Sequence, residues 1–224
     1  MSIDIYVCWT VERRQRGGQD MRVTRAQAEQ NRAHIVATAA RLFRERGYDG
    51  VGVAELMAEA GFTHGGFYKH FRSKAALMAE ASASGLSQTA ARTEGLEIAK
   101  FVESYVSREH RDRRGEGCTI AALSGDAARQ PEDVRTEFAA GIESLTTALQ
   151  AGGDPPPDTD QRTARATVID VLAHSVGAIM LSRACQDGSP LADEILDVCR
   201  EAILASLAHG DGDRPTTEGL VSRS

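Results

Sequence analysis

The chain has 224 residues, of which 42% are hydrophobic, 26% charged and 5% aromatic, and it carries a formal net charge of −6 at pH 7. A chain of this length buries roughly 70% of the surface that its unfolded form exposes, so it needs no disulfide or metal ion to fold. The composition excludes collagen-like, mucin-like and strongly disordered proteins. At the scale of the whole chain, the acidic balance argues against a nucleic-acid partner, because a polyanion attracts basic proteins.

Neither a membrane span nor an export signal is predicted. The most apolar stretch, residues 167–184, is interrupted by Asp170, His174 and Arg183. It therefore falls short of the ~20 apolar residues that a span needs. The four cysteines are scattered, without a CxxC pair or histidines at zinc spacing. We therefore expect free thiols, no metal site and a cytoplasmic protein.

Residues 1–20 have no helical periodicity. They contain the only tryptophan, Trp9, a basic cluster at residues 13–16 and a glycine pair at residues 17–18. Two interpretations are open: a flexible basic arm, or an extension upstream of a true start at Met21. In either case we expect a flexible extension without packed structure, because such a composition cannot bury a core.

From Arg25 onward, apolar residues recur at helical spacing and no segment has the alternation of a strand. The first helix is expected to end at Gly47, and the second, which is short, at Gly61. Thr63 is the expected N-cap of a third helix that runs to about residue 71. Ser73 is the expected N-cap of a fourth.

The later part of the chain has longer helical patterns. An apolar stripe over residues 98–106 predicts one helix, a polar run over residues 108–117 interrupts the pattern, and the next helix begins near Cys118. Pro131 suits the first position of a helix that continues to Leu149. After a loop at residues 152–157, two more helices are expected at about 160–186 and 191–208. The sequence thus predicts an all-α fold of about nine helices.

The second and third helices together have the pattern of a helix-turn-helix. Val53, Leu56 and Met57 form the apolar face of the first of them, and Phe67 and Phe71, one turn apart, anchor the second inward. The remaining side chains of that second helix are polar and small. Such a helix N-terminus can enter the major groove and approach the edges of the bases. The outward-facing residues are Thr63, His64, Gly65, Gly66, Tyr68, Lys69 and His70.

The charges are divided unevenly along the chain. Residues 1–80 hold 12 Lys and Arg against 9 Asp and Glu, a net charge of +3, and the remaining residues have a net charge of −9. The basic excess thus coincides with the predicted helix-turn-helix, where the release of counterions from DNA would favour binding.

Three segments resemble the TetR family of one-component transcriptional regulators. They are residues 32–36 (RAHIV), 42–48 (LFRERGY) and 60–74 (AGFTHGGFYKHFRSK), and the resemblance extends over residues 24–81. It implies that the third helix reads DNA, with Tyr68, His70 and Lys74 at phosphate-contacting positions. His64, Gly65, Gly66 and Lys69 match positions near the bases. Gly52 departs from the family, which usually has a threonine or serine cap there that touches a phosphate.

The same resemblance implies a two-domain regulator. Residues 21–74 would bind DNA, residues 75–210 would bind a ligand and form the dimer, and residues 211–224 would be a disordered tail. The last two helices would pair across a two-fold axis, so that a homodimer binds a palindromic double-stranded DNA operator and a small-molecule inducer releases it. The expected interface residues, for which packing within one chain is the alternative, are Val168, Val171, Leu172, Ser175, Ile179, Leu191, Ile195, Val198 and Ala202.

The expected ligand pocket lies among the middle helices, and its candidate residues are also ordinary core residues. They are Phe101, Tyr105, Cys118, Leu123, Phe138, Ile142, His174 and Met180. Cys118, beside Gly117 at a helix start, could also act as a thiolate that senses an electrophile or oxidant, although a small buried cap is the simpler interpretation. The other alternative is a helical binding protein without DNA recognition. No sequence motif of an enzyme is found, so we expect neither catalysis nor a cofactor.

Overall fold

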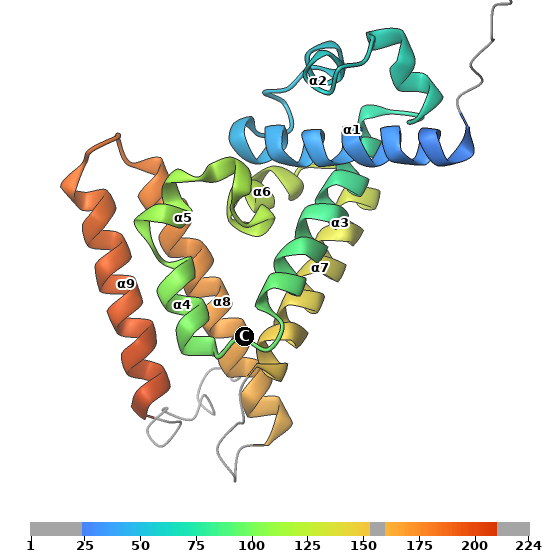
Figure 1. The fold of residues 1–224 in the computed structure, drawn as a ribbon. Coiled ribbons are helices and arrows are strands. Elements are labelled where there is room, and N and C mark those ends of the chain that lie inside the picture. The colour runs from blue at the N-terminus through green and yellow to red at the C-terminus, as the bar shows by residue number, and fades with distance from the viewer. Residues whose placement is uncertain (1–23, 153–159, 210–224) are drawn as a thin grey trace, which may run out of the picture.

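The computed structural model describes residues 24–152 and 160–209. Within these ranges the chain is helical without a strand, which confirms the predicted all-α fold (Figure 1). The calls for a flexible arm at residues 1–20 and a disordered tail at 211–224, and most of the predicted loop at 152–157, lie outside the described residues. The elements are α1 (Arg25–Arg46), α2 (Val53–Glu59), the 3-10 helix η1 (His64–Lys69), α3 (Lys74–Thr93), α4 (Ile98–Tyr105), α5 (Arg108–Asp112), the 3-10 helix η2 (Arg114–Glu116), α6 (Thr119–Ala127), α7 (Glu132–Ala151), α8 (Gln161–Ala184) and α9 (Pro190–His209).

The N-terminal unit consists of α1, α2 and η1. The hydroxyl of Thr24 accepts a hydrogen bond from the Gln27 N–H at 3.1 Å and caps the start of α1. The helix ends at Gly47, whose φ of 74° is a left-handed conformation that side-chain-bearing residues avoid. Ile35 and Phe43 of α1 are fully buried. In Figure 1, α1 lies between α2 on one side and the larger set of C-terminal helices on the other.

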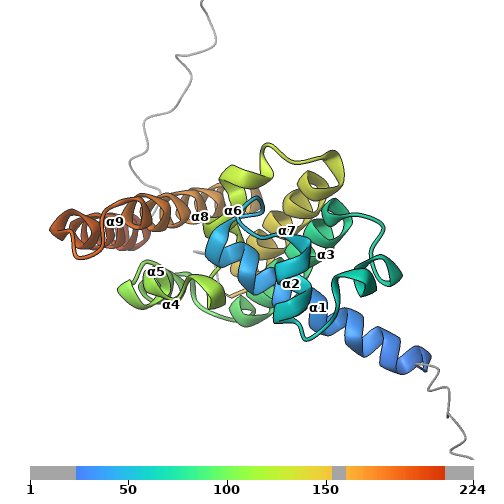
Figure 2. The same cartoon turned by 90° about the horizontal axis from the view of Figure 1, so that it is seen from above.

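The helices α3 and α7 pack side by side along much of their length (Figures 1 and 2). Gly141 of α7 allows this close approach, because a Cβ atom there would lie 2.5 Å from Cδ1 of Leu86 in α3. The Ser73 hydroxyl caps α3 by accepting a hydrogen bond from the Ala76 N–H at 3.1 Å, as the sequence predicted. A helix that begins directly after the N-terminal unit is thereby fixed to the core of the C-terminal part.

The last two helices, α8 and α9, lie side by side at one edge of the molecule (Figure 2). Among the described helices, α8 is long and apolar enough to cross a membrane, judged by length and composition alone. About 33% of its most apolar part is buried inside the protein. A core helix of a soluble protein meets the same criterion, so one such helix is only weak support for a membrane span.

Three predicted boundaries were wrong in detail. The third helix is a short 3-10 helix and ends at Lys69, because two successive glycines disfavour the α-helix and 3-10 geometry suits short segments. The polar run at residues 108–117 contains α5 and η2, which have no apolar side chain and therefore leave no apolar periodicity in the sequence. Pro131 occupies the N-cap of α7 and precedes its first residue, Glu132.

Candidate DNA-binding surface and ligand pocket

The recognition helix, as we call η1 (His64–Lys69), is fixed to the N-terminal unit by two aromatic side chains. Phe67 is 1% exposed and Phe71, just beyond the end of the helix, is 2% exposed, with their ring centroids 5.5 Å apart. Met57 of α2 is fully buried beneath them in the same core. The predicted inward anchors are therefore confirmed, and they determine which face of η1 points outward.

The outward face carries most of the predicted DNA-contacting residues. Thr63, His64, Gly65 and Lys69 are exposed, and the Tyr68 side chain is 69% exposed, with its ring packed edge-on against Phe67 at 5.2 Å. Thr63 takes the N-cap conformation, but its hydroxyl makes no capping hydrogen bond. These side chains lie on one exposed surface, where they are accessible to a binding partner.

Neither glycine of η1 is required by packing within the protein. A Cβ atom on Gly65 would meet nothing within 4 Å, and one on Gly66 would be at 3.7 Å from Met57 Cε and Thr63 Oγ1, an ordinary contact. Each glycine disfavours a helix by roughly 1 kcal/mol relative to alanine. Their presence therefore favours a close approach of the backbone to an external partner.

Arg32 of α1 holds the end of the recognition helix. Its Nη1 donates to the carbonyl oxygen of His70, its Nε donates to Glu80 Oε1 of α3 at 3.0 Å, and its guanidinium lies 4.2 Å from the ring centroid of Phe71. One side chain thus connects α1, the residues after η1, and α3. Arg32 was part of the sequence pattern, but this function depends on contacts between residues far apart in the chain.

Two other predicted positions have constraints that the sequence did not reveal, and a third, Gly52, is as the sequence predicted. His70 is half-buried, with its ring near those of Phe62 and Phe71. Lys74 is also half-buried, and its Nζ donates to the carbonyl oxygen of Tyr48 at 2.6 Å, so part of its hydrogen-bonding capacity is used within the protein. Gly52 is the N-cap of α2 and provides no side-chain cap, as its identity predicted.

A pocket of about 520 Å³ lies between α3, α4, α5 and the start of α6. Three of the predicted ligand residues line it, namely Phe101, Tyr105 and Cys118. Leu123 and Phe138 are buried in the core and do not line it. Ile142, His174 and Met180 do not line this pocket: all three are exposed on the outer faces of α7 and α8, where helical periodicity alone does not separate a core face from an outer one.

The inner wall of the pocket contains a neutral histidine that the sequence analysis did not single out. The Nδ1–H of His110 donates to the Tyr105 carbonyl oxygen at 2.7 Å, and its Nε2 accepts from the Cys118 N–H at 3.0 Å. Burial lowers the pKa of His110 to about 4. The histidine is therefore neutral near pH 7 and fixes the start of α6, where Cys118 is 3% exposed.

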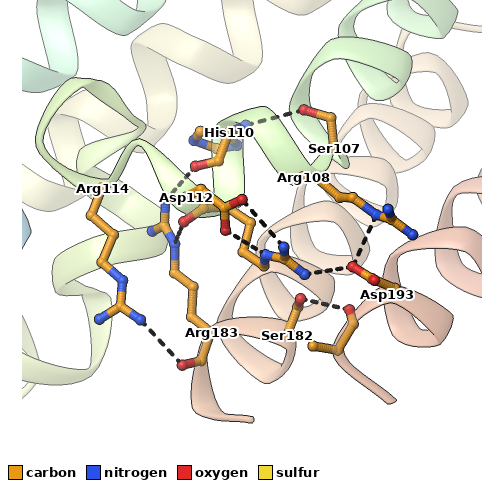
Figure 3. Close-up of polar contacts among 10 residues, drawn as sticks. Ser107, Arg108, His110, Asp112, Arg114, Ser182, Arg183 and Asp193 are labelled. Carbon is orange, nitrogen blue, oxygen red and sulfur yellow. Dashed lines mark hydrogen bonds and ion pairs between the residues drawn. The ribbon is translucent and has the colours of Figure 1, made fainter. Parts of the chain in front are cut away.

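A polar network joins α5 to the last two helices (Figure 3). Arg183 of α8 donates from Nε to the Arg111 carbonyl oxygen at 3.0 Å and from Nη2 to the His110 carbonyl oxygen at 2.7 Å. Arg111 in turn pairs with Asp193 of α9 at 2.7 Å. Ser107 is the one residue in the sequence that could have indicated the start of α5. Its hydroxyl caps this helix by accepting a hydrogen bond from the His110 N–H at 3.2 Å.

The predicted interface residues on α8 do not face outward. Val168, Val171, Leu172, Ser175 and Ile179 are all buried within the single chain, because this stripe packs on the neighbouring helices, so the alternative of core packing within one chain applies to them. The exposed apolar residues of α8 form a different stripe. On both helices together the large exposed ones are Ile169, Met180, Leu181, Leu191 and Val198. On α9 the predicted Leu191, Val198 and Ala202 are exposed, and Ile195 is intermediate.

No group of three or more His, Cys, Asp or Glu that could hold a metal ion occurs in residues 24–152 and 160–209. These residues form an exposed 3-10 helix that packs on α2 and is held to α1 by Arg32, joined to a helical part with a pocket. The fold and the site together define a helix-turn-helix protein whose larger helical part contains a pocket.

Comparisons with known proteins find similarity to one family of bacterial regulators. Residues 35–81 match the family model described as bacterial regulatory proteins, tetR family. The chain is 29% identical over 205 residues to the HTH-type transcriptional repressor DhaR of Mycobacterium sp. (strain GP1), which covers 86% of this chain and 97% of DhaR. It is 37% identical over 59 residues to the HTH-type transcriptional regulator AcrR of Shigella flexneri, which covers 26% of this chain and 27% of AcrR.

Solved structures have the same fold. The reduced form of E. coli NemR has a TM-score of 0.62 at 20% identity, covering 78% of this chain and 95% of NemR. A TetR-family regulator from Agrobacterium tumefaciens has a TM-score of 0.60 at 21% identity, covering 80% and 98%. The resemblance predicted from the sequence is confirmed: residues 35–81 match the tetR family of bacterial regulatory proteins, and a regulator from the curated proteins is similar over most of the chain.

Proposed function

We propose that this protein is a ligand-responsive transcriptional repressor that binds operator DNA through the recognition helix. The observation that carries the proposal is the exposed polar face of η1, held by buried Phe67 and Phe71 in the segment that matches the TetR family. A relative that spans almost the whole chain, DhaR, is named a transcriptional repressor. The regulator would work in the cytoplasm, where the DNA is.

The roles of individual residues follow from exposure and chemistry. His64, Gly65, Gly66 and Lys69 would meet base edges, because they form the outer face of η1. Tyr68 would place its hydroxyl on a phosphate while its ring stays on Phe67. Thr63, with its uncapped hydroxyl, and His70 would contact the backbone of the DNA. Lys74 would use its remaining N–H donors for a phosphate.

The proposed domain division is at residue 74, the first residue of α3. Residues 21–74 would form the DNA-binding domain and residues 75–210 the ligand-binding and dimerisation domain. Because α3 begins at the boundary and packs along α7, a movement of the C-terminal helices would be transmitted to the recognition helix.

A homodimer would form through α8 and α9. Their exposed stripe of large apolar side chains favours a self-complementary contact across a two-fold axis, since monomeric proteins rarely expose large contiguous apolar patches. Two copies of η1 would then face successive turns of a palindromic operator. Substituting Leu181, which is 60% exposed, with glutamate should yield monomers in analytical ultracentrifugation, whereas Ile142→Glu on the outer face of α7 should not.

An inducer in the pocket would be coupled to DNA binding through Arg44 of α1. The Arg44 Nε donates to the Gly115 carbonyl oxygen at 2.8 Å, next to pocket residues Glu116 and Gly117. Gly85 leaves room for this contact, because a Cβ atom there would lie 2.9 Å from Arg44 Nη1. A ligand that moves the loop before α6 would thus move α1 and shift the population of DNA-binding conformations.

DNA recognition can be tested by comparing variants in which one of the few lysines is replaced by alanine. The chain has lysines only at residues 69, 74 and 100. In titrations of the intergenic DNA upstream of its own gene across salt concentrations, Lys69→Ala should weaken specific binding by about tenfold or more, since a base contact is worth about 1–3 kcal/mol. Lys100→Ala removes an equal charge on α4, where Lys100 pairs with Glu97, and should have little effect.

Two results would contradict the proposal. One is the absence of sequence-specific, salt-sensitive binding to any fragment of that DNA. The other is an equal loss of affinity for Lys69→Ala and Lys100→Ala, which would indicate a general effect of charge with no recognition surface on η1.

A further inference from the structure

The pocket has an apolar wall and a polar end. Leu96, Phe101 and the ring of Tyr105 form the apolar wall, and the Phe101 and Tyr105 ring centroids are 4.8 Å apart. His110 and Cys118 form the polar end, and His110 is neutral near pH 7. The chemistry of its ligand therefore depends on the charged groups around that end.

Two half-buried arginines lie beside the polar end and form no ion pair with a carboxylate of the described residues. Arg44 donates to the Gly115 carbonyl oxygen and, at 3.5 Å, to the Thr119 hydroxyl. Arg183 donates only to main-chain carbonyl oxygens, and its Nη2 would be 3.2 Å from a Cβ atom on pocket residue Gly117. In both cases burial is the largest cause of the lowered pKa of the guanidinium, and the charges of Glu45 near Arg44 and Asp112 near Arg183 offset it only in part.

The mouth of the pocket contains one arginine that is free and one that is paired. Arg113 forms ion pairs with Glu109 at 3.0 Å and Glu116 at 3.9 Å. Arg92 also lines the pocket, but it has no hydrogen bond or ion pair with any other part of the chain that the structure describes. Glu103 is the one pocket carboxylate left without an ion pair there, and it is exposed on α4.

Two buried hydrogen-bond donors near the pocket lack an acceptor. The hydroxyl of Tyr105, which is buried beside the Cys118 thiol, has no nitrogen or oxygen partner within the described residues. The same is true of Nη1 of Arg183. An unsatisfied buried donor costs about 1–3 kcal/mol, so a site with two of them favours a ligand that supplies an acceptor.

We propose that this pocket binds a small organic anion, a carboxylate attached to an apolar body. The carboxylate accepts a hydrogen bond from the Tyr105 hydroxyl and is stabilised by the positive charges of Arg92 and Arg183. The apolar body packs on Leu96 and Phe101. A neutral ligand would leave the arginines uncompensated, and a cation would be repelled by them. This inference rests on the proposed function, since it names the chemical class of the effector.

The test is isothermal titration calorimetry of the full chain, without DNA, with 3-phenylpropionate as the probe and 3-phenylpropionamide as its uncharged counterpart. The acid should bind and the amide should bind at least about tenfold more weakly, as expected for loss of a charge-assisted hydrogen bond. Arg92→Gln should weaken binding of the acid by about tenfold. Arg113→Gln, the paired arginine at the same mouth, should change it by less than about twofold, and Glu103→Gln should tighten it.

Tyr105→Phe tests the polar end separately from folding. Because the hydroxyl has no nitrogen or oxygen partner among the described residues, its removal should leave the melting temperature unchanged or raise it, while binding of the acid falls severalfold. Equal affinities for acid and amide, no binding of the acid, or equal losses for Arg92→Gln and Arg113→Gln would each overturn the proposal. Operator binding is measured separately. Intact operator binding with no preference for the acid therefore refutes the ligand class alone, and absent operator binding refutes the proposed function.

Discussion

Acidification should destabilise this protein through His110. The imidazole can only be neutral in its native position, because Nε2 accepts a hydrogen bond from the Cys118 N–H at 3.0 Å while Nδ1–H donates to the Tyr105 carbonyl oxygen at 2.7 Å. Protonation of Nε2 would remove the acceptor and bring a positive charge next to Arg183. Burial is the largest cause of the lowered pKa, which is about 4 compared with 6.5 for a free histidine.

The sign and size of the effect follow from these two pKa values. The unfolded chain takes up a proton below pH 6.5, whereas the folded chain does so only below about pH 4, so unfolding binds a proton between them. The stabilising contribution is complete above pH 6.5, falls as the pH drops, and is lost below about pH 4. Its full size is about 3 kcal/mol, and about 2 kcal/mol of it disappears between pH 7.5 and pH 5.

Urea unfolding at a fixed protein concentration, at pH 7.5 and pH 5, measures this loss. His110→Gln keeps one donor and one acceptor without a titrating group, so its free energy of unfolding should change with pH by about 2 kcal/mol less than that of the wild type. His64→Gln alters an exposed histidine of η1 and should retain the full loss. If the wild type and His110→Gln lose equal stability between the two pH values, His110 is not the group responsible and the argument fails.

The remaining predictions concern packing and the recognition helix. Gly141→Ala should lower the free energy of unfolding by about 1–3 kcal/mol, because the added methyl group overpacks the contact between α3 and α7. Gly125→Ala, at an open site in α6, should raise the free energy of unfolding by about 0.5–1 kcal/mol. Thermal melts that show the same sign for both variants would contradict the packing argument. Gly52→Ser should strengthen operator binding by about threefold to tenfold in a binding titration, because the serine hydroxyl can cap α2 and reach a phosphate. An unchanged affinity would show that the backbone at residue 52 already makes the phosphate contact. Arg32→Ala should lower the free energy of unfolding by about 1–2 kcal/mol in chemical denaturation and should weaken operator binding. Arg25→Ala, which breaks a solvent-exposed ion pair, should change the free energy of unfolding by less than about 0.5 kcal/mol. Similar losses for the two variants would contradict the role assigned to Arg32.

Several properties of this protein were determined by the sequence alone, because they depend on local patterns. Helical periodicity predicted the all-α fold, and Gly47 and Ser73 marked a helix end and a helix start where the structure has them. Phe67 and Phe71 were predicted to face inward from their spacing, and that assignment determined the exposed face of the recognition helix. In each case the signal lies within a few residues of the feature that it specifies.

Only the tertiary structure decided which faces of the later helices are internal. In α8 two apolar stripes alternate along one helix, and periodicity cannot tell which of them packs inside the chain, so Val168 was assigned to the surface and Leu181 was overlooked. The pocket likewise depends on α5 and η2, which lack an apolar stripe and are held by contacts such as that between Arg183 and the His110 carbonyl oxygen, 73 residues apart in the chain. Local propensity specifies helices and their ends, whereas a binding site and a surface arise from pairs of distant residues whose proximity exists only after the helices have packed.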